Sequence, residues 1–268
     1  MSTVVFLGGG RITTAMIAGL RLSNAKHRLV VHDRNPGKLR KLKKDYGVAI
    51  EPELKNAVRQ AELLVVAVRP DSVRELLRSI GKVHRPVLAV SLAAGLPLRA
   101  LSKTLGAPVR WARAMPSPVC RSGRGLTGVT FPRGLSIRDR KRIRDLFATF
   151  GQVVEIPENK FDAFTVSYSS SHGYHALVTL ATAAERAGLD RRTALVASAH
   201  GLADGIIAWR EGKYSLESLL EEAATPGGIA ATTMAAADAA GYRRAVRKGV
   251  MEGLRRARVN ARTWISRH

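Results

Sequence analysis

The first half of the chain alternates apolar runs with stretches of helical periodicity. The apolar runs predict strands at 3–7, 28–33, 48–50, 63–68 and 86–91. The periodic stretches predict helices at 12–22, 38–45, 54–60 and 71–80. The run at 63–68 is apolar throughout, which is typical of parallel strands buried on both faces. Strands and helices in turn predict an α/β fold with a doubly wound parallel sheet.

The second half of the chain shows a different pattern. From Asn159 onward no strand-like run occurs and helical periodicity dominates. The expected helices lie at 161–187, 191–210, 216–222, 229–239 and 242–265. We therefore expect two domains, an α/β domain over residues 1–157 and an all-helical domain over residues 158–268.

The last expected helix carries two stripes. Apolar residues recur at steps of three and four, which predicts a core or dimer-interface face: Val246, Val250, Leu254, Ala257, Ala261 and Ile265. Basic residues fall on another face, which we expect to be solvated: Arg244, Lys248, Arg255, Arg258 and Arg262.

Composition limits the class of protein and the cellular compartment in which it is expected. The chain has 268 residues, of which 46% are hydrophobic and 24% charged, as in ordinary globular proteins. Because no apolar run approaches the roughly 18 residues of a membrane span, none is expected. The chain starts without a signal-like segment, and its lone cysteine, Cys120, excludes an intramolecular disulfide framework. We therefore expect a cytoplasmic protein.

The net charge is strongly positive. Lys and Arg number 44 against 21 Asp and Glu, giving +23 and a pI near 11.3. Such a field attracts anions, including nucleic acid. The basic residues are spread over the chain rather than gathered in a tail, which favours a solvated basic surface over a nucleic-acid partner. No group of Cys, His, Asp and Glu has metal-ligand spacing, so no metal is expected.

Three glycines, Gly8 to Gly10, stand where the first strand meets the first helix. With Thr13 in the third position they follow the G-x-G-x-x-G pattern, which brings a phosphate close to backbone N–H groups. The second strand then ends in Asp33 and Arg34. The acid suits a ribose diol, whereas Arg34 with Lys38 suits a 2′-phosphate. We expect NADPH, with NADH as the alternative.

Ligands on doubly wound sheets lie beyond the carboxyl ends of the strands. The turns that follow the fourth and fifth predicted strands are therefore expected to line the same crevice as the glycines. The predicted cofactor-binding residues are Gly8, Gly10, Arg11, Ile12, Thr13, Arg34, Asn35, Val68, Arg69, Pro70, Ala93 and Ala94.

Five blocks, in order, give the chain a family resemblance over nearly its full length. They read FLGGGRITTAMIAGL, LVVAVRPDSV, AVSLAAGL, VRWARAMPSP and ATPGGIAATTMAAADAAGYRRAVRKGV. In these blocks the chain resembles the pyrroline-5-carboxylate reductase family. The resemblance implies an N-terminal Rossmann domain, a C-terminal helical dimerisation domain and often larger rings. It also implies hydride transfer from NAD(P)H to a cyclic C=N bond, with proline as product, in a site between one subunit's nicotinamide and helices of the dimer.

The Pro-Gly-Gly before the helix at 229–239 is the expected substrate anchor. Its helix N-terminus offers N–H groups and a positive dipole end to a carboxylate. Where family members usually have two threonines, this chain has Ile229 and Ala230. The predicted substrate-binding residues are Gly227, Gly228, Ile229 and Ala230.

The family's Gly-Ser-Gly-Pro-Ala-Tyr block appears here as residues 169–174. Ser170 and Tyr174 keep their places, whereas His172 replaces a proline. These three are the catalytic candidates. His172 is read either as a proton donor or polar contact to an altered substrate, or as a histidine that caps a helix start. The Met-Pro-Asn-Thr-Pro block is shortened at 115–118, and Arg11 stands where asparagine is common.

The function expected from this resemblance is reduction of pyrroline-5-carboxylate to proline by a homodimer or larger homo-oligomer. Two alternatives stay open because the substrate end departs from the family pattern. One is a paralogous reductase of a different cyclic imine in a specialised pathway. The other is a cofactor-binding dimer that has lost catalysis.

Overall fold

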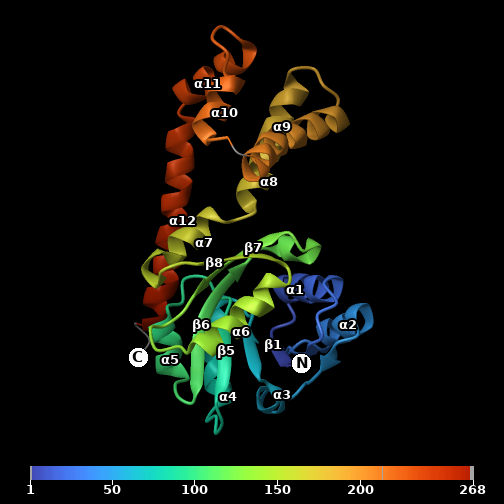
Figure 1. Cartoon of the computed structure of the whole chain (residues 1–268), viewed down its shortest axis with the longest axis vertical. Coiled ribbons are helices and arrows are strands. Elements are labelled where there is room, and N and C mark those ends of the chain that lie inside the picture. The colour runs from blue at the N-terminus through green and yellow to red at the C-terminus, as the bar shows by residue number, and fades with distance from the viewer. Residues whose placement is uncertain (1, 213, 266–268) are drawn as a thin grey trace. The chain divides into compact units, whose positions relative to one another are not determined.

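The structure, a computed structural model, describes residues 2–212 and 214–265 (Figure 1). By packing, the chain divides into two compact units. The α/β unit comprises Met1–Tyr168 and Glu252–His268, and the helical unit comprises Ser169–Met251. The α/β unit thus includes residues 158–168 and the end of the chain, which the sequence pattern assigns to the helical domain. The domain division at 157/158 stays a prediction.

An eight-stranded sheet forms the centre of the described α/β unit. Its strands are β1 (Thr3–Leu7), β2 (Arg28–His32), β3 (Ala49–Ile50), β4 (Leu63–Val66), β5 (Val87–Ser91), β6 (Val109–Pro116), β7 (Gly125–Thr130) and β8 (Gly151–Glu155). Their order is β3-β2-β1-β4-β5-β6-β7-β8. Strands β1 to β6 run parallel, and β7 pairs with β6 in the antiparallel sense. The expected doubly wound sheet is confirmed.

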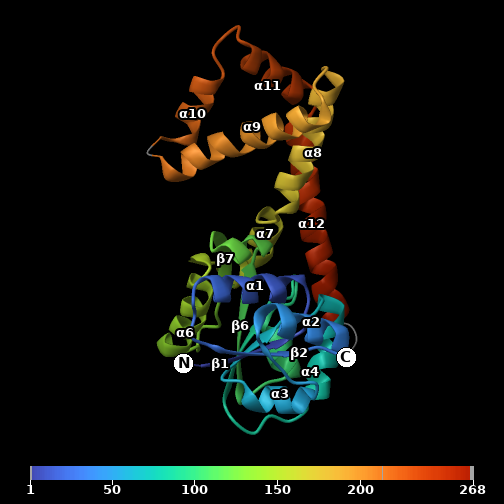
Figure 2. The same ribbon diagram turned by 90° about the vertical axis from the view of Figure 1, so that its right-hand side faces the viewer.

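Helices cover both faces of this sheet (Figures 1 and 2). One apolar core joins the sheet to α1 (Arg11–Leu22), α2 (Pro36–Tyr46) and α6 (Ile137–Ala148). A second core joins it to α3 (Leu54–Gln60), α4 (Pro70–Ile80) and α5 (Leu98–Thr104). Alternate residues of one strand feed the two cores: Val4 and Phe6 enter the first, Val5 and Leu7 the second. Burial on both faces explains why these strands read as continuous apolar runs.

The helical unit contains α8 (Ser171–Arg186), α9 (Arg191–Glu211), α10 (Leu216–Ala223), α11 (Ile229–Ala239) and the first part of α12 (Tyr242–Ile265). Helices α8 and α9 pack against each other. Among the described residues of this unit only Ala181, Ala194 and Ser198 are buried. Large apolar side chains on all five helices are exposed, among them Leu195, Ile206, Trp209 and Met234.

The single helix predicted over 161–187 was wrong. The chain instead forms α7 (Phe161–Ser167), which lies in the α/β unit, and α8, with a break between them. At the break the hydroxyl of Ser169 accepts from the N–H of Ser171 at 3.3 Å and bonds to its hydroxyl at 2.6 Å. Serine side chains compete in this way with helical backbone bonds, which favours interruption of the helix.

The apolar stripe of α12 meets two environments. Val246, in the helical unit, is 47% exposed. Ala257 is buried, and a Cβ on Gly95 would lie 2.6 Å from its carbonyl oxygen, so the end of α12 packs on the loop after β5. Trp264 enters the second core of the sheet. The side chain of Ile265 lies outside the described residues, and the basic stripe is exposed.

Candidate active site

The carboxyl ends of the central strands meet at one edge of the sheet. Leu7 of β1 pairs with His32 of β2 and with Val66 of β4, and Val66 pairs with Ser91 of β5. Strand order reverses between β1 and β4, because the chain continues outward to β2 and β3 on one side and to β5 on the other. In sheets of this kind ligands bind beyond the strand ends at this reversal.

The glycine turn at the end of β1 is closely fitted to its surroundings. Gly8 has φ +106°, and a Cβ there would lie 2.9 Å from the Ala67 carbonyl oxygen, so both backbone and space require glycine. The buried Thr13 hydroxyl donates to the Gly8 carbonyl oxygen at 2.5 Å. Thr13, predicted to bind cofactor, therefore holds the shape of the turn.

Asp33, at the end of β2, fixes the other side of the glycine turn. Its Oδ2 accepts from the Gly9 N–H at 2.7 Å and its Oδ1 from the Asn35 N–H at 2.8 Å. Lys38 lies nearby, with its Nζ 3.8 Å from Oδ2. Asp33 was weighed from sequence only as a ligand for a ribose diol. In the structure each of its two oxygens already accepts a backbone N–H.

The start of α1 is open for an anion. Its N-cap is Gly10, which leaves the first helical turn without a side-chain cap. A Cβ on Gly10 would meet nothing within 4 Å, so the space beside the turn is free. Arg11 is exposed and Ile12 half-buried in this first turn. An uncapped helix N-terminus with open space in front of it fits a dinucleotide's diphosphate.

Past the end of β2, Arg34 and Asn35 have different roles. The Arg34 side chain is 79% exposed, and its only described ion pair is a long one to the equally exposed Glu75, at 3.6 Å. A pair of this kind contributes little, so the guanidinium is available to a ligand. The Asn35 side chain instead accepts from the N–H groups of Gly37 and Lys38 and caps α2.

Two further turns stand at the same edge. Val68, Arg69 and Pro70 link β4 to α4, with Arg69 exposed and Pro70 in the first turn of the helix. Ala93 and Ala94 follow β5, where Ala93 is buried and donates its N–H to the Ser91 hydroxyl. The structure thus brings all the predicted cofactor-binding residues to one sheet edge. Contact of each residue with a cofactor stays a prediction.

A buried charge cluster near the end of β6 was missed from sequence. Arg113, 2% exposed, pairs with Glu158 at 3.1 Å and with Asp162 at 2.8 Å, and its guanidinium lies over the Phe161 ring. Glu158 also accepts from the Leu98 N–H. The cluster ties β6 to the start of α7. The available signal was an arginine between two alanines in a strand that carries a second arginine, Arg110, but the partners of Arg113 are 45 and 49 positions away.

The three catalytic candidates lie at the start of α8. Ser170 is the N-cap of the helix and half-buried, whereas His172 and Tyr174 are exposed. Ser170 and Tyr174 are four positions apart and share a side of the helix. His172, two positions from each, points away from that side. The catalytic role of each stays a prediction, with Ser170 and Tyr174 better placed to act on one ligand.

The four substrate-binding candidates form the start of α11. Gly227 has φ +76°, and Gly228 is the N-cap, which provides no side-chain cap to the first turn. Ile229 is 89% exposed. The Thr232 hydroxyl donates to the Gly228 carbonyl, so it does not cap the N–H groups of the first turn. The turn can therefore offer N–H groups to a carboxylate, as the sequence predicts.

The described residues give little support to metal-dependent chemistry or to a cysteine nucleophile. They contain no group of three or more His, Cys, Asp or Glu able to hold a metal ion. Burial raises the pKa of the Cys120 thiol to about 11, so the thiol stays protonated near neutral pH and is a poor nucleophile. In the described part of the chain, no helix is both long and apolar enough to cross a membrane.

Two family models match the chain, one in each half. Residues 3–95 match the model described as NADP oxidoreductase coenzyme F420-dependent. Residues 158–259 match the model described as pyrroline-5-carboxylate reductase dimerisation. The crystal structure of a pyrroline carboxylate reductase from Plasmodium falciparum with NADP bound has a TM-score of 0.86 and 20% identity, covering 97% of this chain and 98% of its own. That likeness confirms the fold over both halves.

Relatives from bacteria share more sequence. The pyrroline-5-carboxylate reductase of Corynebacterium melassecola is 31% identical over 213 residues, covering 76% of this chain and 79% of that protein. The enzyme of the same name from Thermus thermophilus is 30% identical over 259 residues, covering 94% and 96%. With identity at this level across both halves, the chain belongs to the pyrroline-5-carboxylate reductase family.

Proposed function

We propose that this protein reduces pyrroline-5-carboxylate to proline with NADPH. The observation that carries the proposal is the open glycine turn at the strand-order reversal, joined in one chain to a helical half of the family type. When bound, NADPH supplies the hydride. The α1 N-terminus holds the diphosphate, and Arg34 stands at the end of β2, where a 2′-phosphate is bound in folds of this type.

The substrate requires orientation more than activation. Protonation of the ring nitrogen makes the imine carbon electrophilic, and the rate of hydride transfer then depends on how the two reactants are positioned. The first turn of α11 donates N–H groups to the substrate carboxylate. Ser170 and Tyr174 offer hydroxyls from one side of α8 for the ring nitrogen. His172 makes a polar contact to the substrate.

The protein works as a homodimer or a larger homo-oligomer. Within the described residues of the helical unit only three side chains are buried, too few for a stable core of its own. Its exposed apolar side chains are of the kind that a second copy covers. The match of residues 158–259 to a dimerisation model supports the same assembly. A cytoplasmic location stays a prediction.

The test is a steady-state assay of NADPH oxidation with chromatographic detection of proline. The substrates are pyrroline-5-carboxylate, its six-membered homologue, and pyrroline without a carboxylate. We expect the first to give the highest kcat/KM and the last the lowest, because it lacks the group that α11 binds. Preference for the six-membered ring would favour the paralogous-reductase alternative, which Ile229 and Ala230 motivate. NADPH binding without turnover of any imine would favour the lapsed-enzyme alternative.

A variant of the glycine turn separates cofactor loss from unfolding. Gly10→Asp puts a carboxylate where the diphosphate is expected, yet aspartate is a favourable N-cap, so thermal stability should hold. We expect at least about a hundredfold loss of kcat/KM for NADPH, since like charges meet at close range. Gly10→Asn, equal in size but neutral, should lose less. Equal losses for the two variants would mean that bulk rather than charge decides.

A further inference from the structure

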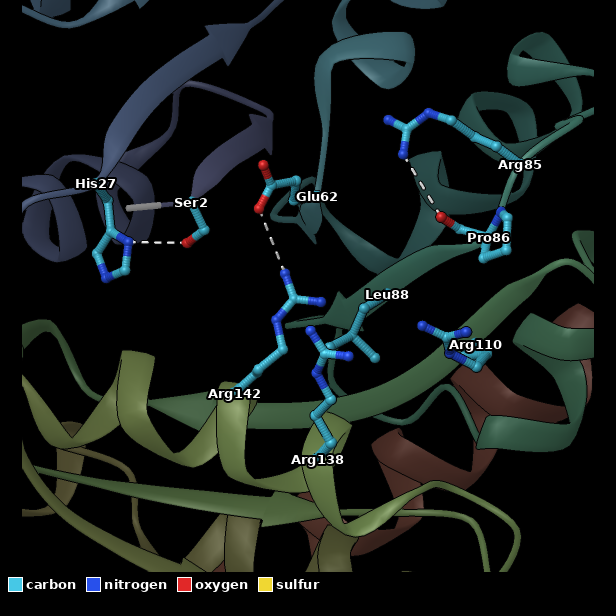
Figure 3. Close-up of a pocket in the computed structure, with 9 residues that line it drawn as sticks. All are labelled: Ser2, His27, Glu62, Arg85, Pro86, Leu88, Arg110, Arg138 and Arg142. Carbon is cyan, nitrogen blue, oxygen red and sulfur yellow. Dashed lines mark hydrogen bonds and ion pairs between the residues drawn. The ribbon is translucent and has the colours of Figure 1, made fainter.

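A pocket lies at the opposite edge of the sheet from the glycine turn (Figure 3). Its lining includes Ser2, His27, Glu62 and Pro86, which directly precede β1, β2, β4 and β5. Because these strands are parallel, all four residues mark the amino ends. A strand of about five residues spans roughly 16 Å, so this pocket is separate from the candidate active site.

Arginine dominates the lining of this pocket. Arg85 precedes β5, Arg110 lies in β6, and Arg138 and Arg142 lie in α6. Arg138 and Arg142 are four positions apart, and Figure 3 shows their guanidinium groups extending from the helix close to each other. Like charges at this spacing destabilise a helix. An anion bound between them would remove this repulsion.

The carboxylates at the pocket do not balance these charges. Asp139, next to Arg138, pairs with Arg110 at 2.9 Å, and Glu62 meets Arg142 at 3.7 Å. Four guanidinium groups therefore meet two carboxylates, which leaves a local excess of two positive charges. The described hydrogen bonds and ion pairs include none for the Arg138 side chain, which is exposed at the rim.

The other polar groups are already engaged. Arg85 donates through Nη2 to the carbonyls of Arg59 and Ala61 at 2.7 and 2.6 Å, where it closes the end of α3. Ser2 and His27 bond to each other at 2.9 Å. Arg138 is thus the guanidinium without a described partner at the pocket. Arg142 lies beside it and is held only by the long 3.7 Å pair to Glu62, so these two side chains can take a ligand.

We propose that this pocket binds a small phosphate dianion, held by Arg138 and Arg142 at a site distinct from that of the cofactor. Guanidinium groups are suited to phosphate because they offer paired donors in a planar fork. The dianion's charge equals the local excess. The same chemistry fits inorganic phosphate and the phosphate group of a mononucleotide, and the test has an arm for each.

The experiment is isothermal titration of the full-length protein with inorganic phosphate and, separately, with AMP. The protein is first saturated with NADP⁺, so that the α1 N-terminus cannot supply the signal. Buffer and chloride are held constant because such binding depends on salt. We expect saturable binding of at least one of the two probes with NADP⁺ present. Tighter binding of AMP would identify a nucleotide phosphate as the ligand.

Variants locate the signal. Arg138→Gln and Arg142→Gln should each weaken binding about tenfold or more, since each removes a charge-assisted contact. Arg133→Gln is the matched control, because Arg133 is exposed just before α6 but does not line the pocket. It should change binding less than about twofold, as a distant charge in salt would. All three variants should keep the thermal midpoint of the parent protein.

Two results would overturn the proposal. The first is the absence of saturable binding of both probes once NADP⁺ fills the crevice. The second is equal weakening by Arg133→Gln and Arg138→Gln, which would show that the general positive field attracts phosphate without a site.

Discussion

The hydroxyl of Thr13 offers a direct test of how the glycine turn is held. It is buried and donates to the Gly8 carbonyl oxygen at 2.5 Å, five positions back across the turn. Thr13→Val keeps the shape of the side chain and removes the donor, which leaves a buried carbonyl without that partner. Such a loss costs about 1–3 kcal/mol. For a unit of this size that corresponds to a fall in Tm on the order of 5 °C.

Thr14 supplies the matched control. Its hydroxyl donates to the Gly10 carbonyl oxygen at 3.1 Å, but that oxygen also accepts the Thr14 N–H at 3.0 Å and keeps this bond in Thr14→Val. The expected loss is therefore below about 0.5 kcal/mol, as for substitutions away from buried polar groups.

The assay has two readouts, calorimetric unfolding and fluorescence titration with NADPH. Thr13→Val should lower Tm and raise the Kd for NADPH about fivefold, equivalent to roughly 1 kcal/mol, because the turn no longer holds its N–H groups in one geometry. Thr14→Val should change neither by much. Equal Tm shifts for the two variants, or an unchanged Kd for Thr13→Val, would refute the assignment of Thr13 to the turn.

In binding titrations, Arg34→Ala should weaken the binding of NADPH by about 1.5–3 kcal/mol and that of NADH far less. Arg40→Ala, at an exposed position on α2, should change the binding of neither cofactor. Equal losses for both cofactors in Arg34→Ala would exclude a contact to the 2′-phosphate. Arg113→Met should lower the free energy of unfolding, measured by urea titration, by on the order of 3 kcal/mol. The reason is that the carboxylates of Glu158 and Asp162 lose their buried partner. A loss under about 1 kcal/mol would show that the cluster contributes little to stability. Ile229→Thr with Ala230→Thr should raise kcat/KM for pyrroline-5-carboxylate without a change in Tm, since both positions are exposed; no gain would show that the pocket compensates elsewhere.

The sequence predicted the part of the fold that local pattern controls. The runs predicted as strands at 3–7 and 63–68, which form β1 (Thr3–Leu7) and β4 (Leu63–Val66), are continuously apolar because both faces of the sheet are covered. Gly8 adopts a positive φ in the glycine turn that the sequence predicted. The break at Ser169 was missed because serine is tolerated in helices, and the hydroxyl bonds between Ser169 and Ser171 at the start of α8 depend on local geometry. Elements between 98 and 155 were not assigned at all.

At the site, the structure shows side-chain contacts that the sequence did not predict. The side chains of Thr13 and Asn35 hold the glycine turn and cap α2, roles that the sequence did not predict, and their contact with a cofactor stays a prediction. Asp33 anchors the turn through two backbone N–H groups. These roles depend on contacts between segments distant in sequence, which neither spacing nor periodicity encodes.

Hydride transfer from NADPH to the imine carbon of pyrroline-5-carboxylate can be followed with an isotope label. The most direct measurement uses NADPH deuterated at either face of nicotinamide C4, with mass spectrometry and NMR of the proline formed. We predict that one of the two labelled cofactors gives proline with a single deuterium at C5, the former imine carbon, in amounts equal to NADPH consumed. Oxidation of NADPH without labelled proline from either cofactor would mean that the protein does not reduce this imine.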